Sequence, residues 1–388
     1  MNISGIYNNF FEKFGNRDDK PVLFFSPGRV NLIGEHTDYN GGYVFPCALS
    51  FGTYLATRKI PEPLIRMATT NFPFTAEIPL EKPFLKIGEE WVNYPLGVVS
   101  ELAKRGFKPE GLEMVFSGNI PNKSGLSSSA SIEMVTAVAL DELYNLGYDR
   151  IELVKIGRAA ENNFVGVNCG IMDQFASGMG RKDHAIYLNC DTLDYELVPV
   201  KLDGYKLVIA NTNKVRGLAD SKYNERVAEC QAAVKALQSG KPIQYLAELS
   251  SAEFEQYNHL IPDEVVMRRA RHAVLENERT SLAVKTLKAG DLVRFGQLMN
   301  DSHDSLRDDY EVTGLELDTL VAESRKIPGV IGSRMTGAGF GGCTVSLVKD
   351  EAVERMIAEV GPAYHAITGL TADFYVAEIG DGAKRIEL

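Results

Sequence analysis

Short apolar segments bounded by Gly, Asn and Pro occupy the first third of the chain, a pattern typical of β-strands. The last of these segments leads directly into a loop rich in Gly and Ser. Strands are therefore predicted at residues 22–26, 43–47, 53–58 and 112–117.

Beyond that loop, apolar residues recur at helical spacing. Two helices are predicted at residues 131–144 and 151–164, so the Gly/Ser loop opens a helix. Further strands are predicted at residues 184–188, 207–210, 343–347 and 374–377. The second half is otherwise mainly helical, with periodic stretches at residues 219–238, 265–289, 291–306, 315–325 and 351–360.

A strand-rich first half and a helix-rich second half closed by strands predict an α+β protein of two lobes. The length of 388 residues fits two domains at roughly 150 residues each. We expect an N-terminal lobe at residues 1–200 and a C-terminal lobe at residues 201–388, with the boundary near residues 195–205. A small-molecule site is expected in the cleft between them.

The charge balance narrows the choice of partner. Lys and Arg total 41 and Asp and Glu total 52, which gives a net charge of −11. An acidic surface repels phosphate backbones and anionic membranes, so neither nucleic acid nor a membrane is the expected partner. No apolar run approaches the ~18–20 residues of a membrane span.

Cysteine usage and the N-terminus point to the cytoplasm. The first twenty residues lack a basic start followed by an apolar stretch, so no secretory signal is expected. The cysteines are odd in number and scattered, without CxxC spacing, which predicts reduced thiols and neither a zinc site nor a disulfide framework. They are Cys47, Cys169, Cys190, Cys230 and Cys343.

The Gly/Ser loop has the chemistry of a phosphate site. Unpaired backbone N–H groups and a partial positive charge at a helix start bind phosphate, and Gly lets the backbone approach it. Hydroxyls add donors and a Mg²⁺ ligand, although an N-cap without a ligand has the same composition. The GxxxxGK[ST] pattern is not met, because Asn122 stands where its second Gly is required.

A second glycine cluster at residues 337–342 has the spacing GxGxxG. A dinucleotide-binding loop of this kind opens a helix, whereas a strand is predicted to follow here. By itself, the cluster predicts a tight structural turn.

The third unusual segment, residues 26–42, is dense in polar and charged side chains. Arg29, Glu35, His36 and Asp38 lie there among several glycines. Carboxylates and an imidazole on one loop suit the hydroxyls of a sugar, which need both acceptors and donors. A surface loop with a salt bridge is the simpler alternative.

Four segments together carry a family resemblance. Residues 28–39, GRVNLIGEHTDY, are similar to the galactokinase signature, and residues 120–131 resemble the ATP motif of the GHMP kinase superfamily. Residues 334–343 resemble that superfamily's third motif, and CGIMDQ at residues 169–174 lies between them. The resemblance implies a two-lobed GHMP-kinase-like fold, with a mixed sheet in the N-terminal lobe and the active site between the lobes. It also implies transfer of the ATP γ-phosphoryl group to α-D-galactose, the first phosphorylation of galactose catabolism by the Leloir pathway.

The resemblance further assigns expected roles, residue by residue. Asp173 would be the base for the anomeric hydroxyl, and Arg29 the catalytic arginine beside it. Galactose would be held by Glu35, His36, Thr37, Asp38, Gly170, Asp173 and Tyr223. ATP would be held by Lys123, Ser124, Gly125, Leu126, Ser127, Ser128 and Ser129, with Trp91 and Tyr94 on the adenine side, and Mg²⁺ by Ser129 and Glu161.

Several of these residues have structural alternatives. Asp173 also suits a helix N-cap, and Glu161 a solvated helix position. Trp91, Tyr94 and Tyr223 suit ordinary packing. Lys123 replaces a residue that is usually small in the family, and its ammonium either contacts a phosphate or points to solvent.

Functional alternatives within the resemblance are kinases for N-acetylgalactosamine or another sugar, mevalonate-type kinases, and a galactose sensor without turnover. Residues 35–38 favour a sugar over mevalonate. The complete Ser/Ala stretch at residues 127–131, together with Arg29 and Asp173, favours catalysis. We expect a monomer or a weak oligomer.

Two remaining groups of residues receive no functional role. Four histidines lack motif support, namely His184, His259, His272 and His365. A cluster of four aspartates and a histidine has side chains of the kind that bind metals, but on a predicted helix it is interpreted as a solvated face; it comprises Asp301, His303, Asp304, Asp308 and Asp309.

Overall fold

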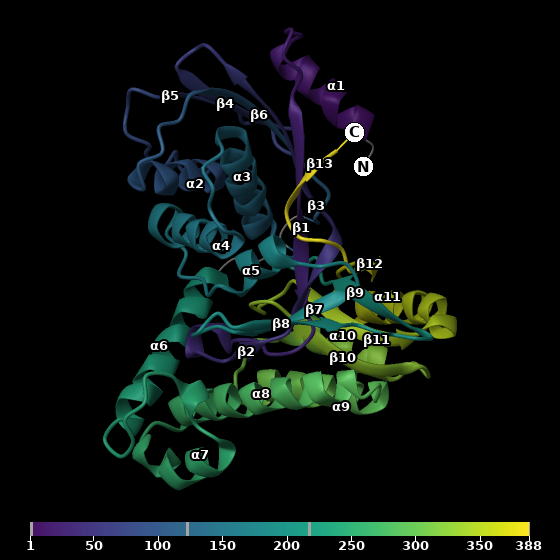
Figure 1. Ribbon diagram of the computed structural model, residues 1–388. Coiled ribbons are helices and arrows are strands. Elements are labelled where there is room, and N and C mark those ends of the chain that lie inside the picture. The colour runs from purple at the N-terminus through teal and green to yellow at the C-terminus, as the bar shows by residue number, and fades with distance from the viewer. Residues whose placement is uncertain (1–2, 122–123, 216–218, 388) are drawn as a thin grey trace.

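The computed structural model describes residues 3–121, 124–215 and 219–387, and it has two lobes (Figure 1). The N-terminal lobe is built on a six-stranded sheet with the order β13-β1-β3-β6-β4-β5. Only the pair β4 and β6 is parallel, so the sheet is mixed, as predicted. The strands are β1 (Val22–Asn31), β3 (Pro46–Ile60), β4 (Leu64–Thr69), β5 (Ala76–Pro79), β6 (Gly111–Gly118) and β13 (Lys384–Ile386).

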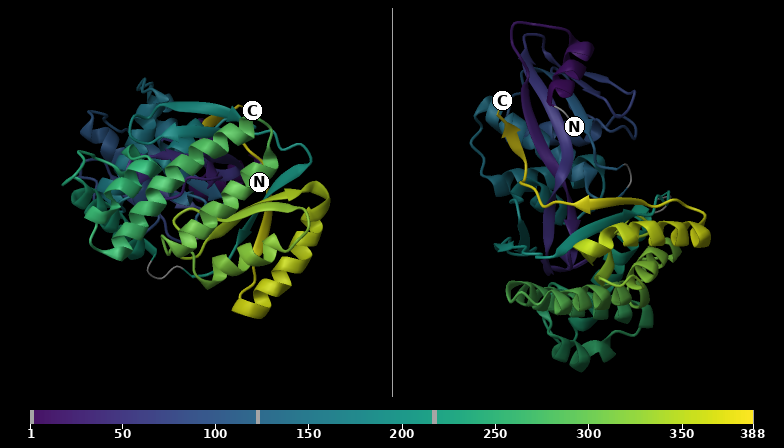
Figure 2. Two further views of the ribbon diagram at one scale, coloured as in Figure 1. Left: turned by 90° about the horizontal axis from the view of Figure 1, so that it is seen from below. Right: turned by 90° about the vertical axis from the view of Figure 1, so that its right-hand side faces the viewer.

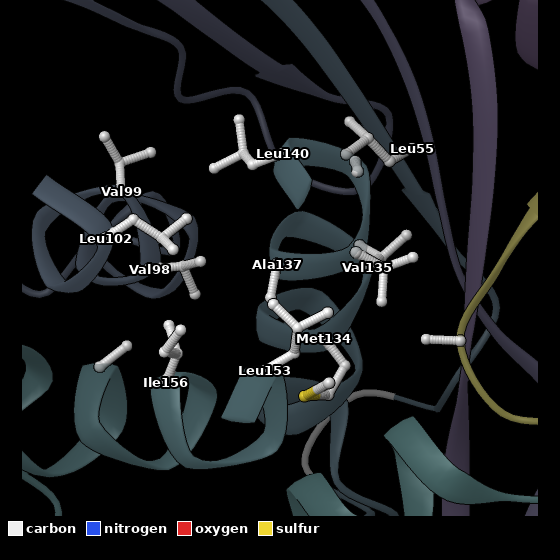
Figure 3. Packing of buried hydrophobic residues seen from close by; sticks show 14 of the residues in the cluster. Leu55, Val98, Val99, Leu102, Met134, Val135, Ala137, Leu140, Leu153 and Ile156 are labelled. Atoms are coloured by element: carbon white, nitrogen blue, oxygen red, sulfur yellow. The ribbon is translucent and has the colours of Figure 1, made fainter. Parts of the chain in front are cut away.

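Alternation along the strands gives this sheet two buried faces. Leu23 and Val115 face α1 (Ile3–Phe14), whereas their neighbours Phe24 and Phe116 join the main core. Figure 3 shows that core, where side chains of three helices point toward one another. The helices on this face are α2 (Asn93–Lys104), α3 (Ser128–Tyr144), α4 (Arg150–Ala159) and α5 (Met172–Met179).

The C-terminal lobe contains an antiparallel sheet with the order β10-β11-β9-β12. Its strands are β9 (Tyr205–Asn211), β10 (Val330–Thr336), β11 (Cys343–Lys349) and β12 (Asp373–Ala377). Helices α10 (Leu315–Arg325) and α11 (Val353–Thr368) cover one face, and α8 (Glu264–Lys288) and α9 (Leu292–Asp308) the other. Figure 2 shows these layers from two further directions.

The remaining elements connect the lobes or extend the second one. A small sheet has the order β2-β7-β8 and comprises β2 (Tyr43–Val44), β7 (His184–Asn189) and β8 (Tyr195–Pro199). Two helices extend the C-terminal lobe, α6 (Ala219–Leu237) and α7 (Ser251–Tyr257). Short turns are η1 (Asp38–Asn40), η3 (Leu246–Glu248), η4 (Asn258–Leu260) and η5 (Asp350–Ala352).

The predicted elements are present, with altered ends. The helix predicted at residues 151–164 ends at Ala159 and continues as a π-helical turn, η2 (Ala160–Val165). The division at residue 200 does not fully separate the sheets, because β13 pairs with β1. Elements that the pattern did not indicate are α1, α2, α5, α7, β4, β5, β8, β10 and β13.

The interpretation of residues 301–309 as a solvated face is wrong for one member. The His303 side chain is buried, its Nδ1 accepts a hydrogen bond from the backbone N–H of Met335 at 3.2 Å, and its Nε2 lies 3.2 Å from Asp318. This histidine connects α9 to β10 and α10.

No helix in the described ranges combines the length and apolarity needed to cross a bilayer.

Candidate active site

Arg29 enters the site from β1, at a register shift in its pairing with β3. Its backbone N–H donates to the carbonyl of Leu126 at 3.1 Å, which joins the strand to the Gly/Ser loop. A Cβ at Gly28 would lie 2.6 Å from the same carbonyl oxygen, so a larger residue there would separate strand and loop.

The buried guanidinium of Arg29 forms a two-pronged pair with Asp173. Nε and Nη2 donate to the two carboxylate oxygens at 2.8 and 2.9 Å, while Nη1 donates to the carbonyl of Gly125 at 2.7 Å. The Ser127 hydroxyl also donates to Asp173. Both carboxylate oxygens of Asp173 therefore accept hydrogen bonds, and the carboxylate is held in one orientation.

Asp173 is not the N-cap suggested as its alternative role. Helix α5 begins at Met172, and the N-cap position is taken by Ile171. Asp173 therefore lies in the first helical turn with its carboxylate directed to Arg29.

The loop at residues 34–38 carries the predicted sugar-binding side chains. The Glu35 carboxylate accepts hydrogen bonds from the backbone N–H of Gly337 at 2.8 Å and from Arg334 at 3.3 Å. Glu276 of α8 accepts the backbone N–H groups of Gly34 and Glu35 at 3.0 and 3.4 Å. The loop is thus held by residues almost 250 and 300 positions away in sequence.

His36 has a left-handed backbone conformation with φ of 62°, and its ring is held on both nitrogens. Nε2 lies 3.2 Å from the carbonyl of Ala338 and must donate to it, so Nδ1 accepts from the Tyr39 hydroxyl at 2.8 Å. Burial, followed by the charge of His272, lowers the pKa of His36 to about 3. The ring is therefore neutral near pH 7.

Asp38 lies against Gly170, where a Cβ would approach its Oδ2 to 1.7 Å. Burial, and then repulsion from Asp173 and Glu35, raises the pKa of Asp38 to about 7. Thr37 differs from its neighbours, because its fully buried hydroxyl contacts the carbonyls of Gly34 and Tyr43 at 3.0 and 2.7 Å.

These side chains surround a cavity of about 150 Å³. Among the described residues, neither Thr37 nor any member of the Gly/Ser loop lines it. From the predicted sugar-binding and catalytic sets, it is lined by Arg29, Glu35, His36, Asp38, Gly170, Asp173 and Tyr223.

A larger cavity of about 890 Å³ lies at the start of α3. Trp91, Tyr94, Ser128 and Ser129 line it. The Trp91 indole N–H donates to the carbonyl of Phe74 at 3.1 Å and the ring packs edge-on against Phe116, also a lining residue.

The Gly/Ser loop turns into α3 through left-handed residues. Gly125 has φ of 77° and Ser127 has φ of 60°, and the helix begins at Ser128. Ser124 and Leu126 are buried, and neither lines the larger cavity. Lys123 lies outside the described residues.

Glu161 is buried in the π-helical turn and does not form the solvated position given as its alternative. Burial, followed by repulsion from Asp173, raises the pKa of Glu161 to about 7, and its carboxylate hydrogen-bonds to Ser129. The Gln174 amide donates to Glu161 at 2.6 Å and to the buried Glu133 at 2.9 Å. Ser129 and Glu161 thus form an adjacent pair of oxygen donors between the two cavities.

The glycine cluster at residues 337–342 forms the turn between β10 and β11, as predicted. Gly337, Gly339, Gly341 and Gly342 all have positive φ. The turn brings the N–H of Gly337 to Glu35 and the carbonyl of Ala338 to His36; the loop at residues 34–38 that carries both is called the sugar loop below.

Comparison with known proteins matches the same segments. The galactokinase galactose-binding signature matches residues 8–59, and the N-terminal and C-terminal GHMP kinase domains match residues 93–181 and 283–366. The galactokinase of Fusobacterium nucleatum is 56% identical over 94% of this chain and 95% of its own length. This chain belongs to the galactokinase family.

Other members of the galactokinase family agree in sequence and structure. The Bacillus subtilis galactokinase is 52% identical over 99% of this chain and 98% of its own length. The structure of Lactococcus lactis galactokinase with galactose superposes with a TM-score of 0.97 at 49% identity, covering 99% of this chain and 100% of that one. A mevalonate kinase at 19% identity and a TM-score of 0.66 shares the fold, over 92% of this chain and 99% of its own. The predicted family, two-lobed fold and kinase class are confirmed.

The sequence pattern did not identify a row of buried polar residues on α8, of which His272 and Glu276 hydrogen-bond to residues 34–35. Arg269, His272, Glu276 and Thr280 are all buried on α8 at spacings of three and four residues. This spacing places polar side chains on one face, shared with Ala273 and Ala283. Polar residues inside the apolar stripe of the predicted helix were the available signal.

Proposed function

We propose that this member of the galactokinase family transfers the γ-phosphoryl group of ATP to the anomeric hydroxyl of α-D-galactose, giving α-D-galactose 1-phosphate and ADP. The observation that carries the proposal is the pair of Arg29 and Asp173. It lines the smaller cavity and contacts the Gly/Ser loop that leads to the larger one. The galactose complex of the Lactococcus lactis relative supports the choice of sugar.

Galactose occupies the smaller cavity in this proposal. The carboxylates of Glu35 and Asp38 accept hydrogen bonds from sugar hydroxyls, and His36, Gly170 and Tyr223 complete the wall. Thr37 acts indirectly, because its buried hydroxyl holds the loop conformation.

Asp173 is the base in this mechanism. Its ionised carboxylate accepts the proton of the anomeric hydroxyl as that oxygen attacks phosphorus. Arg29 orients Asp173 through its two hydrogen bonds, and its positive charge stabilises the charge that develops on the transferring phosphoryl group.

ATP occupies the larger cavity in this proposal, with the adenine near Trp91 and Tyr94. The phosphates lie against the backbone of residues 124–129 at the start of α3. Ser129 and Glu161 fit Mg²⁺, because they offer adjacent oxygen atoms beside the acidic group of Asp173 and Glu133. The metal, when bound, supplies positive charge to the phosphates.

An ADP-release assay with galactose, N-acetylgalactosamine, glucose and mevalonate tests the proposed substrate. Turnover is expected with galactose. Absence of galactose turnover while another compound reacts would overturn the assignment. N-acetylgalactosamine distinguishes a pocket that admits an acetamido group from one that does not.

Replacement of Asp173 by Asn tests the proposed base. The amide cannot accept the proton, so kcat is expected to fall at least ~100-fold. ATP binding is expected to persist, and it can be followed by the fluorescence of Trp91, the single tryptophan, with Trp91→Phe as the spectroscopic control. A variant that retains most of its activity would show that Asp173 is not the base.

A further inference from the structure

Three buried polar side chains from the C-terminal half of the chain form a hydrogen-bonded set next to the loop that carries Glu35. Glu276 of α8, Ser302 of α9 and Arg334 of β10 are all fully buried. None of the three lines either the sugar cavity or the nucleotide cavity. Any effect on the substrate must therefore pass through the loop that carries Glu35.

Glu276 accepts hydrogen bonds from the backbone of that loop. Its Oε1 accepts the N–H groups of Gly34 at 3.0 Å and Glu35 at 3.4 Å, together with the Ser302 hydroxyl at 2.6 Å. Its Oε2 accepts from Arg279. Although burial opposes ionisation, the charges of Arg279, His272 and Arg334 lower the pKa of Glu276 to about 2. A permanent carboxylate thus fixes two successive backbone N–H groups.

Ser302 connects this carboxylate to Arg334. Because Ser302 donates its proton to Glu276, its oxygen accepts from Nε of Arg334 at 3.2 Å. Nη1 of Arg334 donates to the carbonyl of Asn31 at 3.0 Å and to the Glu35 carboxylate at 3.3 Å. Glu35 is therefore held twice, through its backbone by Glu276 and through its side chain by Arg334.

The charges within this set balance. Glu35 and Glu276 are paired with Arg334 and Arg279, so two anions face two cations. Buried charges persist when they are paired and hydrogen-bonded, whereas removal of one partner leaves an uncompensated charge. A neutral replacement of Glu276 therefore changes the loop without changing the cavity lining.

We propose that Glu276 is a positioning residue for galactose, acting through Ser302, Arg334 and the backbone of residues 34–35 to orient the Glu35 carboxylate. The proposal rests on the sugar-binding role of Glu35 in the proposed function. The proposal predicts different effects on the two substrates: the affinity for galactose depends on Glu276, whereas the affinity for ATP does not.

The test compares Glu276→Gln with Ser302→Ala, which breaks the link to Arg334 but keeps the contacts of Glu276 to the loop. Glu264→Gln, the same chemical change at an exposed position of α8, is the control. Galactose Kd without nucleotide is measured by calorimetry, with KM for both substrates. We expect galactose Kd and KM to rise about tenfold in Glu276→Gln and less in Ser302→Ala, with ATP KM unchanged. Glu264→Gln should match the parent chain.

Thermal unfolding without ligands separates positioning from stability. A folded Glu276→Gln variant with a lower Tm and an unchanged galactose Kd would overturn the proposal. If Glu276→Gln does not fold, Ser302→Ala decides, and an unchanged galactose Kd in that variant overturns it equally.

Glu35→Gln distinguishes this failure from failure of the proposed function. Unchanged galactose binding in Glu35→Gln would remove the sugar-binding role on which the inference depends. Weakened binding in Glu35→Gln together with parental binding in Glu276→Gln would contradict the inference alone.

Discussion

Arg29 makes contacts in two directions that only a guanidinium can combine. Two of its nitrogens hold Asp173 and the third holds the carbonyl of Gly125. An ammonium at Arg29→Lys keeps the charge but cannot form this fork. We expect kcat to fall ~100-fold, as when one donor is lost from a charge-stabilising site. Steady-state kinetics with saturating galactose and ATP would measure it.

The matched control for this prediction is Arg355→Lys. Arg355 is an exposed arginine that pairs with Glu359 on the surface of α11, where such pairs contribute little. The Arg355→Lys substitution should leave kcat unchanged. If Arg29→Lys kept kcat within threefold of the parent chain, a point charge would suffice and the forked geometry would have no catalytic role.

His272 makes a prediction about stability against pH. Its pKa is lowered to about 4 mainly by burial, whereas an unfolded histidine titrates near ~6.5. Below pH ~6.5 the unfolded chain binds a proton that the folded chain does not, so the free energy of unfolding falls as the pH falls. His272→Gln removes this dependence.

The stability difference between the parent chain and His272→Gln should therefore shrink by about 1–2 kcal/mol between pH 7 and pH 5. Urea unfolding at both pH values measures it. Burial is the larger cause of the lowered pKa of His36 and should be the same in both proteins, so most of the contribution of His36 cancels. A constant difference would show that His272 is protonated equally in the folded and unfolded chains.

At the scale of elements, the turn between β10 and β11 depends on its glycines. Gly339 has φ of 81°, and a Cβ there would lie 2.2 Å from the carbonyl oxygen of Val312. Gly339→Ala is expected to lower the free energy of unfolding by about 1–3 kcal/mol, because strain and a clash with backbone add. The change should also raise galactose KM, because the same turn presents Gly337 and Ala338 to the sugar loop.

Gly5→Ala in α1 is the opposite case. Nothing lies within 4 Å of its Cβ position and its φ is ordinary, so alanine should stabilise the helix by up to about 1 kcal/mol. Denaturant unfolding of both variants tests the pair. Equal effects at Gly339 and Gly5 would contradict the conformational argument.

The elements that could be predicted are those with strong periodicity, such as α3, α8 and α9. Helix α2 was not predicted, because Pro95 and Gly97 within it are typical of turns and loops. The need for glycine at this position comes from a tertiary contact, since a Cβ at Gly97 would lie 3.1 Å from Ala160. Packing between helices distant in sequence decided the structure here.

The site was predictable only in part for a similar reason. Motif resemblance named Arg29, Glu35 and Asp173, but Arg29 contacts Asp173 across 144 positions in sequence and Glu35 contacts Gly337 across 302. His272 received no role, because its contact with the carbonyl of Glu35 is visible only after α8 packs against the loop. Buried polar residues act through tertiary neighbours that periodicity does not identify.

At the scale of the whole molecule, the C-terminal segment connects the first sheet to α5. Strand β13 covers the edge of β1, pairing Leu23 with Ile386 (Figure 1). Just before it, the N–H groups of Gly382 and Ala383 donate to the carbonyls of Gly180 and Ser177 at 2.7 and 2.8 Å. The last residues thus support the end of α5, the helix that carries Asp173.

Truncation after Gly380 should therefore expose a strand edge and loosen α5. We expect a lower Tm, association detectable by light scattering, and a kcat that falls by more than ATP KM rises. Gly382→Ala offers a milder change, because its Cβ would lie 2.7 Å from the carbonyl oxygen of Gly178, and it should lower kcat while lowering Tm less than the truncation does. Lys384→Ala, which removes only an exposed side chain and its surface ion pair, should change neither quantity. A truncated chain with parental kcat and Tm would show that α5 keeps its position without the C-terminal segment.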